Sequence, residues 1–218
     1  MSKMRSMPGL LRCYARAGNN CVNRKHLRGV VPDPQRSRDM NGVIDYKGYE
    51  QPHYQVESAD AGAEIRQYGS HLVAEVAMRG DRSTAITRGF RVLARYIFGG
   101  NAQSRKIEMT VPVSQLPEGS DGWVVRFMMP AGMSAGTLPV PNDSRIRFVT
   151  VPPSRQAVRR FSGWPTSNLL QRQSGELAQW IDARGLTIRE GPFYYFYDSP
   201  MTLPWQRRNE VAFRLGEG

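Results

Sequence analysis

An internal repeat is the feature of this sequence that most constrains its fold. One shift of the chain carries Glu64-Ile-Arg66 onto Arg147-Phe-Val149, and it also carries Gly80 onto Gly163. The matches are weak one by one, but they keep the same order in both halves. This predicts that a strand–strand–helix–strand–strand unit occurs twice. Two such units can form one twisted antiparallel sheet, a partial barrel flanked by two helices, so we expect an α+β fold with a duplicated ββαββ unit.

Hydrophobic periodicity gives the elements of each unit. Apolar and polar patterning predicts a strand at residues 54–57 and the four strands of the first unit at residues 63–68, 71–78, 106–113 and 123–129. Between them, apolar residues recur every three or four positions from Ser83, a candidate N-cap, to Phe98, which predicts an amphipathic helix. The second unit is expected to have a helix at 164–184, ended by Gly185, and strands at 145–151, 156–161, 193–197 and 209–215.

Positive charge is concentrated before the repeat. The chain carries 30 Lys and Arg against 19 Asp and Glu, a formal net charge of +11, and residues 1–32 hold seven basic side chains and no acidic one. We expect residues 1–52 to be a basic, disordered arm and linker, and residues 53–218 to be the folded domain. The arm fits a solvated tail, a contact for nucleic acid or acidic lipid, or an Arg-rich targeting segment, and Met40 is an alternative start.

Cysteine usage bears on the compartment. Cys13 and Cys21 both fall in the arm, and a cysteine-free domain fits a reducing environment. We therefore expect a cytoplasmic protein, or an organellar one if the arm is a targeting segment. No apolar run is long enough for a membrane-spanning helix. The body has no signature of a nucleic-acid-binding fold, so no specific nucleic-acid partner is expected.

Catalytic motifs are poorly represented. His26, His53 and His71 have no metal-binding spacing, and no phosphate-binding or dinucleotide-binding glycine loop occurs. The run GMSAG at 132–136 fits the nucleophile pattern of hydrolases, but the prolines on both sides disfavour the strand and the helix which that pattern needs. We expect a binding protein rather than an enzyme.

Apolar and cationic side chains are combined on the first predicted helix. Arg88, Arg91 and Arg95 recur at three and four positions, beside the apolar stripe that includes Phe90. Because guanidinium groups pair with carboxylates, an apolar surface edged by arginines suits a flat hydrophobic anion. A solvent-exposed basic face explains the same spacing. Near the end of the chain, Glu210 is expected to pair with an arginine and to hold the last strand in place.

Several motifs together resemble the SOUL/heme-binding protein family. They are KIEMTVPV at residues 106–113, RFMMP at 126–130, AVRRFSG at 157–163, YDSPM at 197–201 and RRNEV at 207–211. Each is weak alone, but the full set in this order is specific, and the resemblance spans residues 54–215. It implies a twisted antiparallel barrel with two flanking helices, in a monomer that binds heme or another tetrapyrrole.

The resemblance also implies where the tetrapyrrole binds, namely a shallow hydrophobic cleft beside the first helix. The residues implied as contacts are Thr87, Arg88, Phe90, Arg91, Ala94, Arg95, Met201 and Thr202. Some family members have a proposed histidine ligand in the stretch that matches residues 63–68. This chain has none there, and His71, across a turn, is the nearest candidate. We therefore expect no set of metal ligands, and a non-covalent tetrapyrrole held by its face and by arginine–propionate pairs, with weak axial ligation.

Two functions remain open from the sequence. One is a non-enzymatic carrier or buffer for heme or a related tetrapyrrole. The other is a general module that binds small molecules or a partner protein and has incidental affinity for heme. A third, an enzyme acting on a tetrapyrrole, lacks a recognisable nucleophile or acid–base pair in this sequence.

Overall fold

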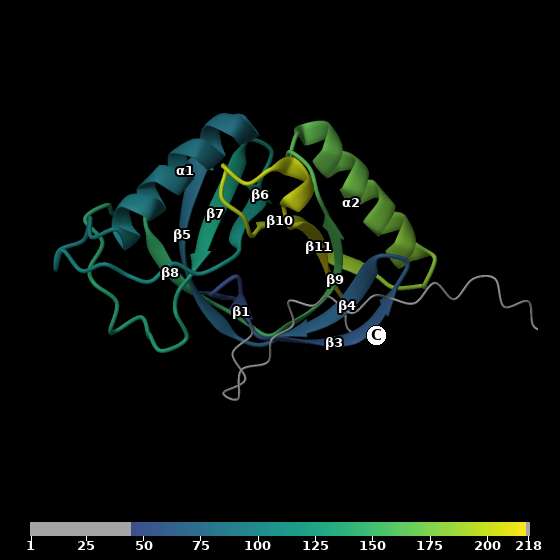
Figure 1. Ribbon diagram of the computed structural model, residues 1–218, viewed down its shortest axis with the longest axis horizontal. Coiled ribbons are helices and arrows are strands. Elements are labelled where there is room, and N and C mark those ends of the chain that lie inside the picture. Colours follow the sequence, from purple (N-terminus) through teal and green to yellow (C-terminus); the bar gives the residue numbers. More distant parts are fainter. Residues whose placement is uncertain (1–44, 217–218) are drawn as a thin grey trace, which may run out of the picture. The chain divides into compact units, whose positions relative to one another are not determined.

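A nine-stranded antiparallel sheet, curled into a half-barrel, organises this chain (Figure 1). The computed structural model describes residues 45–216. The nine strands are β3 (Tyr54–Asp60), β4 (Ala63–Tyr68), β5 (His71–Arg79), β6 (Val113–Glu118), β7 (Gly122–Met128), β8 (Arg147–Val151), β9 (Ser154–Phe161), β10 (Ile188–Phe196) and β11 (Asn209–Leu215). Two helices, α1 (Arg82–Ile97) and α2 (Ser167–Asp182), lie on the same face of the sheet. The predicted α+β fold is confirmed.

The strand order shows how the two units of the repeat are combined. The first unit contains β4, β5, α1, β6 and β7, and the second contains β8, β9, α2, β10 and β11. Across the sheet the order is β3-β4-β9-β11-β10-β6-β7-β5-β8. The first strand of each unit therefore pairs with the second strand of the other: Ile65 lies opposite Ala157, and Val73 lies opposite Val149.

Helix α1 forms where the sequence predicts it, but it begins one residue earlier. Asp81, not Ser83, is the N-cap, because its carboxylate accepts a hydrogen bond from the Thr84 backbone N–H at 3.0 Å. Both residue types cap helices well, so the local sequence does not decide between them. Gly89 faces the sheet, where an added Cβ would lie 2.6 Å from Cγ2 of Val125. Glycine at this position lets the helix approach the sheet closely.

Helix α2 is shorter than the predicted 164–184. Thr166 is its N-cap and accepts a hydrogen bond from the Leu169 backbone N–H at 3.3 Å. Leu177 and Ile181 have no exposed surface and pack against the sheet. Gly185 follows the helix with a φ of +66°, the left-handed conformation expected of a glycine that ends a helix. No helix within residues 45–216 has the length and apolar character to cross a bilayer.

A separate apolar cluster lies beneath each helix. Under α1, Val76, Leu93 and Val125 have no exposed surface, and under α2 the same is true of Leu177 and Val211. Each such side chain contributes roughly 1.5–3 kcal/mol by leaving water. This packing fixes α1 against β5 and β7.

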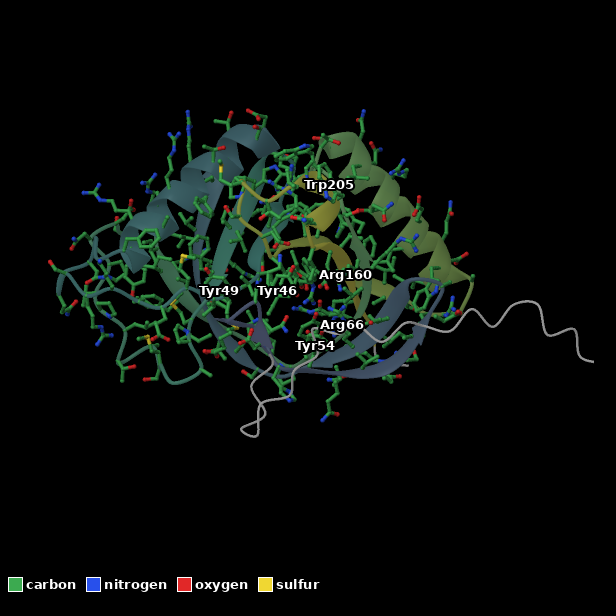
Figure 2. All side chains as sticks on the ribbon, viewed as in Figure 1. Tyr46, Tyr49, Tyr54, Arg66, Arg160 and Trp205 are labelled. Carbon is green, nitrogen blue, oxygen red and sulfur yellow. The ribbon has the colours of Figure 1, made fainter. Side chains whose placement is uncertain are left out.

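The face of the sheet opposite the helices holds a buried charge cluster. The Glu210 carboxylate is fully buried and accepts hydrogen bonds from Arg66 at 2.9 Å, from Arg208 at 2.8 Å and from the Tyr197 hydroxyl at 3.1 Å. Figure 2 shows Arg66 on this side, away from both helices. Burial alone would raise the pKa of Glu210, but the two guanidinium groups outweigh it and lower the pKa to about 2. The pairing expected of Glu210 is confirmed.

The strand predicted over residues 106–113 is wrong. Only Val113 of this segment belongs to a strand, β6. The rest makes isolated bridges, one between Lys106 and Phe98 and one between Thr110 and Glu50. Its apolar residues Ile107 and Val111 are buried although the segment is not part of a continuous ladder, so burial alone gives it the pattern of a strand.

Regular structure begins before His53, the expected start of order. A short hairpin is formed by β1 (Asp45–Tyr46) and β2 (Tyr49–Glu50), and Tyr46 is only 3% exposed. The end of the predicted linker is therefore packed against the domain. The rest of the predicted arm, residues 1–44, lies outside the described residues.

Candidate functional site

An apolar pocket of about 350 Å³ opens beside α1. Phe90, Ala94 and Ile97 of the helix form one wall. The other walls come from β7, from the end of β10, and from the segments that precede β6 and follow β10. They contribute Met109, Val111, Val113, Phe127, Phe196 and Pro200. A lining of this hydrophobic and aromatic kind is typical of small-molecule sites.

Several large apolar side chains around this pocket remain in contact with solvent. Phe90 is 41% exposed, Met109 44% and Phe98 59%. Phe90 rests edge-on against Phe127, with ring centroids 5.4 Å apart. Because exposed apolar side chains that cluster mark binding surfaces, the pocket is suited to cover one face of a flat apolar molecule.

Lys47 and Asp198 form a polar edge of the apolar pocket. Lys47 Nζ lies 2.6 Å from Asp198 Oδ1, and Asp198 also accepts hydrogen bonds from the Tyr46 hydroxyl and the Arg208 backbone N–H. Burial would raise the pKa of Asp198, but these donors lower it. The carboxylate is therefore charged at neutral pH and balances the charge of Lys47.

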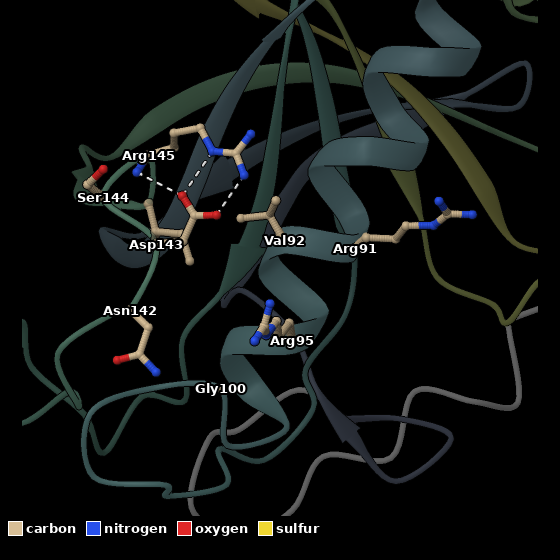
Figure 3. A pocket seen from close by; sticks show the side chains of 9 residues that line it. Arg91, Val92, Arg95, Gly100, Asn142, Asp143, Ser144 and Arg145 are labelled. Carbon is tan, nitrogen blue, oxygen red and sulfur yellow. Dashed lines mark hydrogen bonds and ion pairs between the residues drawn. The ribbon is translucent and has the colours of Figure 1, made fainter.

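A polar pocket of about 470 Å³ lies on another side of α1 (Figure 3). Arg91, Val92 and Arg95 line it together with residues 142–146. There Arg145 pairs with Asp143 at 2.6 Å, and its hydrogen bonds lower the pKa of the Asp143 carboxyl to about 2. Figure 3 shows the Arg91 side chain pointing away from this pair.

The two histidines of residues 45–216 line a third pocket, of about 390 Å³. His53 and His71 lie there with Met129 and Met133. His71 Nδ1 is 3.2 Å from the Gly69 carbonyl oxygen, and burial lowers the His71 pKa. Within the described residues, no group of three or more His, Cys, Asp or Glu side chains is placed to hold a metal ion.

Segments far apart in the sequence meet at the apolar pocket. Its lining takes residues 108–111 and 113 from KIEMTVPV, residues 127–128 from RFMMP and residues 197–200 from YDSPM. Three of the motifs that carry the family resemblance thus line one pocket together with α1.

Comparison with known proteins decides the family. Residues 49–214 match the family model described as SOUL heme-binding protein. The chain belongs to the SOUL family. Heme-binding protein 2 of Homo sapiens is 28% identical over 196 residues, which cover 84% of this chain and 92% of that one. Heme-binding protein 2 of Mus musculus is 31% identical over 156 residues, covering 68% and 75%.

Solved structures share the fold of this SOUL protein at low sequence identity. The EcmrR C-terminal domain has a TM-score of 0.57 at 14% identity, covering 76% of this chain and 99% of that domain. A protein of Listeria innocua described as a hydrolase has a TM-score of 0.52 at 12% identity, covering 73% and 94%. At these identities the likeness extends to the fold alone.

The structure brings together only some of the contact residues expected for a SOUL protein. Phe90, Ala94 and Thr202 line the apolar pocket. Arg91 and Arg95 line the polar pocket instead. The arginine edge and the apolar surface predicted as one site therefore face two different pockets of α1.

The remaining candidates lie outside both of these pockets. Thr87 and Arg88 are exposed on α1, and Met201 is 89% exposed on the loop whose Pro200 and Thr202 line the apolar pocket. His71 lines the third pocket with His53. No histidine is among the residues that line the apolar pocket.

Sequence reasoning missed several lining residues that this SOUL protein contributes. Phe98, Met109 and Phe196 line the apolar pocket but were not among the expected contacts. A signal was present for Met109, because it lies in the motif KIEMTVPV, which was interpreted as a strand. For Phe98 and Phe196, the sequence shows only apolar residues at the end of a helix and of a strand.

Proposed function

We propose that this SOUL protein binds heme or a related tetrapyrrole non-covalently in the apolar pocket beside α1, as a carrier or buffer. The observation that supports this most is the convergence of three family motifs on that pocket. The relatives named Heme-binding protein 2 support the class of ligand.

The size and lining of the pocket fit a ligand held by one face. Ligand pockets span about 300–1,000 Å³, and this one, at about 350 Å³, lies at the small end. A macrocycle would therefore leave one edge in water while its face covers Phe90, Phe98 and Met109. Apolar contact contributes about 25 cal/mol per Å², and the loss of rigid-body freedom opposes it, so we expect micromolar affinity.

Arg91 is the cation best placed to pair with a propionate. Arg91 lines the neighbouring polar pocket, but it lies three residues before Ala94 of the apolar pocket, so it stands on α1 between the two, and its side chain points away from the Asp143–Arg145 pair (Figure 3). Lys47 lies on the lining itself, but Asp198 already balances its charge. Arg88 lines neither pocket of α1 and offers a matched control on the same helix.

Axial ligation of a heme iron would be weak at this site. The lining contains the thioethers of Met109 and Met128 but no histidine or cysteine. Met128 is 6% exposed and Met109 44%, so Met109 is the accessible sulfur. Binding would depend on burial of the ring and on charge pairing, with Met109 as an optional ligand.

Titration of the full chain with hemin, followed by the Soret band, tests the proposal. We expect a saturable shift that weakens about tenfold or more in Arg91→Glu and in Phe90→Glu, because the first loses a charge-assisted hydrogen bond and the second places a carboxylate on the apolar wall. Arg88→Glu makes the same charge change outside the site and should bind as the unchanged protein does.

Two outcomes would contradict the proposal. One is the absence of a saturable shift. The other is an equal loss in Arg91→Glu and Arg88→Glu together with no loss in Phe90→Glu, since this would show a general charge effect. If bulky compounds that are not tetrapyrroles raise the melting temperature more than hemin does, the general binding module is the better description.

A further inference from the structure

Four large apolar side chains project from the surface between the two helices. Met201 is 89% exposed, Trp205 70%, Trp164 53% and Leu203 48%. We call these four residues the tryptophan ridge. Figure 2 shows Trp205 between α1 and α2, on the side of the sheet that carries both helices. Burial of these four side chains within the protein would stabilise it, so their exposure to solvent needs an explanation.

The loop that carries the ridge is held in place by its backbone and by Arg207. Arg207 Nε donates to the Thr202 carbonyl oxygen at 2.9 Å, and its guanidinium group lies 4.1 Å from the centroid of the Trp164 ring. The Gly163 backbone N–H donates to the Pro204 carbonyl oxygen at 2.8 Å. The ridge is therefore a fixed projection, and its apolar side chains are not exposed through a loose loop.

The ridge lies against α1 in space. Arg82, the first residue of α1, donates from Nη1 to the Pro165 carbonyl oxygen at 3.2 Å, next to Trp164 in the chain. Pro200 and Thr202, on either side of Met201, also line the same pocket as Phe90 and Ala94, so the loop of the ridge borders this side of α1.

The segments that supply α1 and the ridge carry arginines and no acidic side chain. Residues 82–107, 163–175 and 199–209, which supply α1 and the ridge, contain no Asp or Glu. Arg88, Arg91 and Arg95 are exposed on α1. They recur at three and four positions, which places them together on the side of the helix opposite the buried stripe.

We propose that α1 and the tryptophan ridge dock together onto the surface of an anionic lipid bilayer, with the ridge inserted at the interface. Tryptophan combines an apolar ring with an N–H donor and favours the membrane–water boundary, while arginines are attracted to anionic headgroups. Apolar side chains near exposed arginines are complementary to such a surface. Of the carboxylates that border these segments, Asp198 is paired with Lys47 and Asp143 with Arg145, and Glu108 lines the apolar pocket. A protein partner could bind the same apolar residues, but binding a protein does not require a set of exposed arginines beside them.

The proposed docking also bears on the apolar pocket. Pro200 and Thr202, within the loop that carries Met201 and Leu203, line that pocket. A docked molecule would therefore hold the pocket close to the bilayer, where apolar ligands dissolve. This last step rests on the proposed function, whereas the docking itself does not, and the experiment below needs no ligand.

Quenching of tryptophan fluorescence by brominated phosphatidylcholine in vesicles tests the docking. The four tryptophans of the chain are at positions 123, 164, 180 and 205, so none lies in the basic residues 1–44. Binding of those basic residues to lipid would sediment the full chain with vesicles but would not bring tryptophan to the brominated acyl chains. We expect quenching in vesicles that contain phosphatidylglycerol, and much less in vesicles of phosphatidylcholine alone.

Surface variants separate the ridge from general apolar exposure. Met201→Ser combined with Trp205→Ser should lower partitioning into anionic vesicles by about tenfold or more, because two apolar side chains no longer insert. The matched control combines Val140→Ser and Ile188→Ser, which are 59% and 39% exposed in other segments, and should partition as the unchanged protein does. A thermal melt of each variant verifies that it is folded.

Three results would overturn the proposal. The first is co-sedimentation without quenching, which would mean that the basic residues 1–44 bind the lipid alone. The second is an equal loss in the ridge variant and in the control variant. The third is the absence of binding to either vesicle, in which case the ridge serves a protein contact or none. A loss of hemin binding alone would contradict the proposed function and leave the docking intact.

Discussion

Replacing Glu210 by Gln tests how the charge cluster opposite the helices supports the last strand. The substitution keeps the size and shape of the side chain and removes only its charge. Arg208 would then remain buried, at 6% exposed, without a carboxylate, and Arg66, at 4% exposed, would keep only Glu64 at 2.7 Å. Breaking a buried pair in this way typically costs about 3–5 kcal/mol, because a charge is left uncompensated in a site from which water is excluded.

The lowered pKa of Glu210 gives a second route to this magnitude. Its ordinary value is 4.5, and in the folded chain it is about 2. The difference corresponds to roughly 3 kcal/mol of stability from the charged form, in agreement with the value for a broken buried pair. Because the folded pKa lies below the unfolded one, this stability is present above about pH 4.5 and is lost as the pH falls toward about 2.

Urea denaturation at neutral pH measures the effect as a shift in midpoint at unchanged slope. Glu57→Gln is the matched control, because Glu57 pairs with Arg155 at 2.6 Å on the surface, and a surface pair contributes below about 1 kcal/mol. The stability difference between Glu210→Gln and the unchanged protein should shrink by roughly half near pH 3. A loss in Glu210→Gln no larger than in Glu57→Gln, or one that does not shrink in acid, would refute the reasoning.

Three further predictions concern packing, burial and capping. Gly89→Ala should lower the free energy of unfolding by about 1–3 kcal/mol, because the added Cβ meets the sheet. Gly175→Ala in α2 has open space around it and should raise that free energy by about 0.5–1 kcal/mol. The urea midpoints of the two variants measure both changes. Burial lowers the His71 pKa, so the folded chain should lose stability as the pH falls below about 6.5, and this slope should flatten in His71→Gln when midpoints are compared between pH 7 and pH 5. Thr166→Ala removes the N-cap of α2 and should lower the free energy of unfolding by about 1 kcal/mol, which a thermal melt measures. An unchanged melting temperature would show that the cap does not contribute to stability.

The elements of the fold could be predicted from local sequence, but their pairing could not. The spacing of apolar residues such as Leu93 and Ile97 predicts α1 to within one residue at each end, because helical periodicity depends only on residues close in sequence. The partner of β4 is β9, from the other unit, and nothing within residues 63–68 specifies this. The segment 106–113 alternates like a strand without being one, because a bridge to a helix end and burial of Ile107 give the same pattern.

The candidate site could be predicted only in part, for a reason that lies in helix geometry. Phe90 and Ala94, which the resemblance implies as contacts, line the apolar pocket, and Phe90 also belongs to the apolar stripe of the helix. Arg91 and Arg95 each follow one of these residues by a single position, but a single position turns an α-helix by about a quarter of its circumference. Neighbours in sequence therefore line different pockets, and only the surrounding loops determine where one pocket ends and the next begins.

The crossed pairing of β4 with β9 and of β5 with β8 has a consequence for how such a chain can be divided. A chain cut after β7 would leave β4 with only β3 as a neighbour and β5 with only β7, so each would have one unpaired edge, and unpaired strand edges invite association with other chains. A single unit could close its sheet only by borrowing a strand from another copy. Each unit therefore pairs its strands with those of the other, as two subunits do in a domain-swapped dimer. We expect the two halves to unfold in one transition.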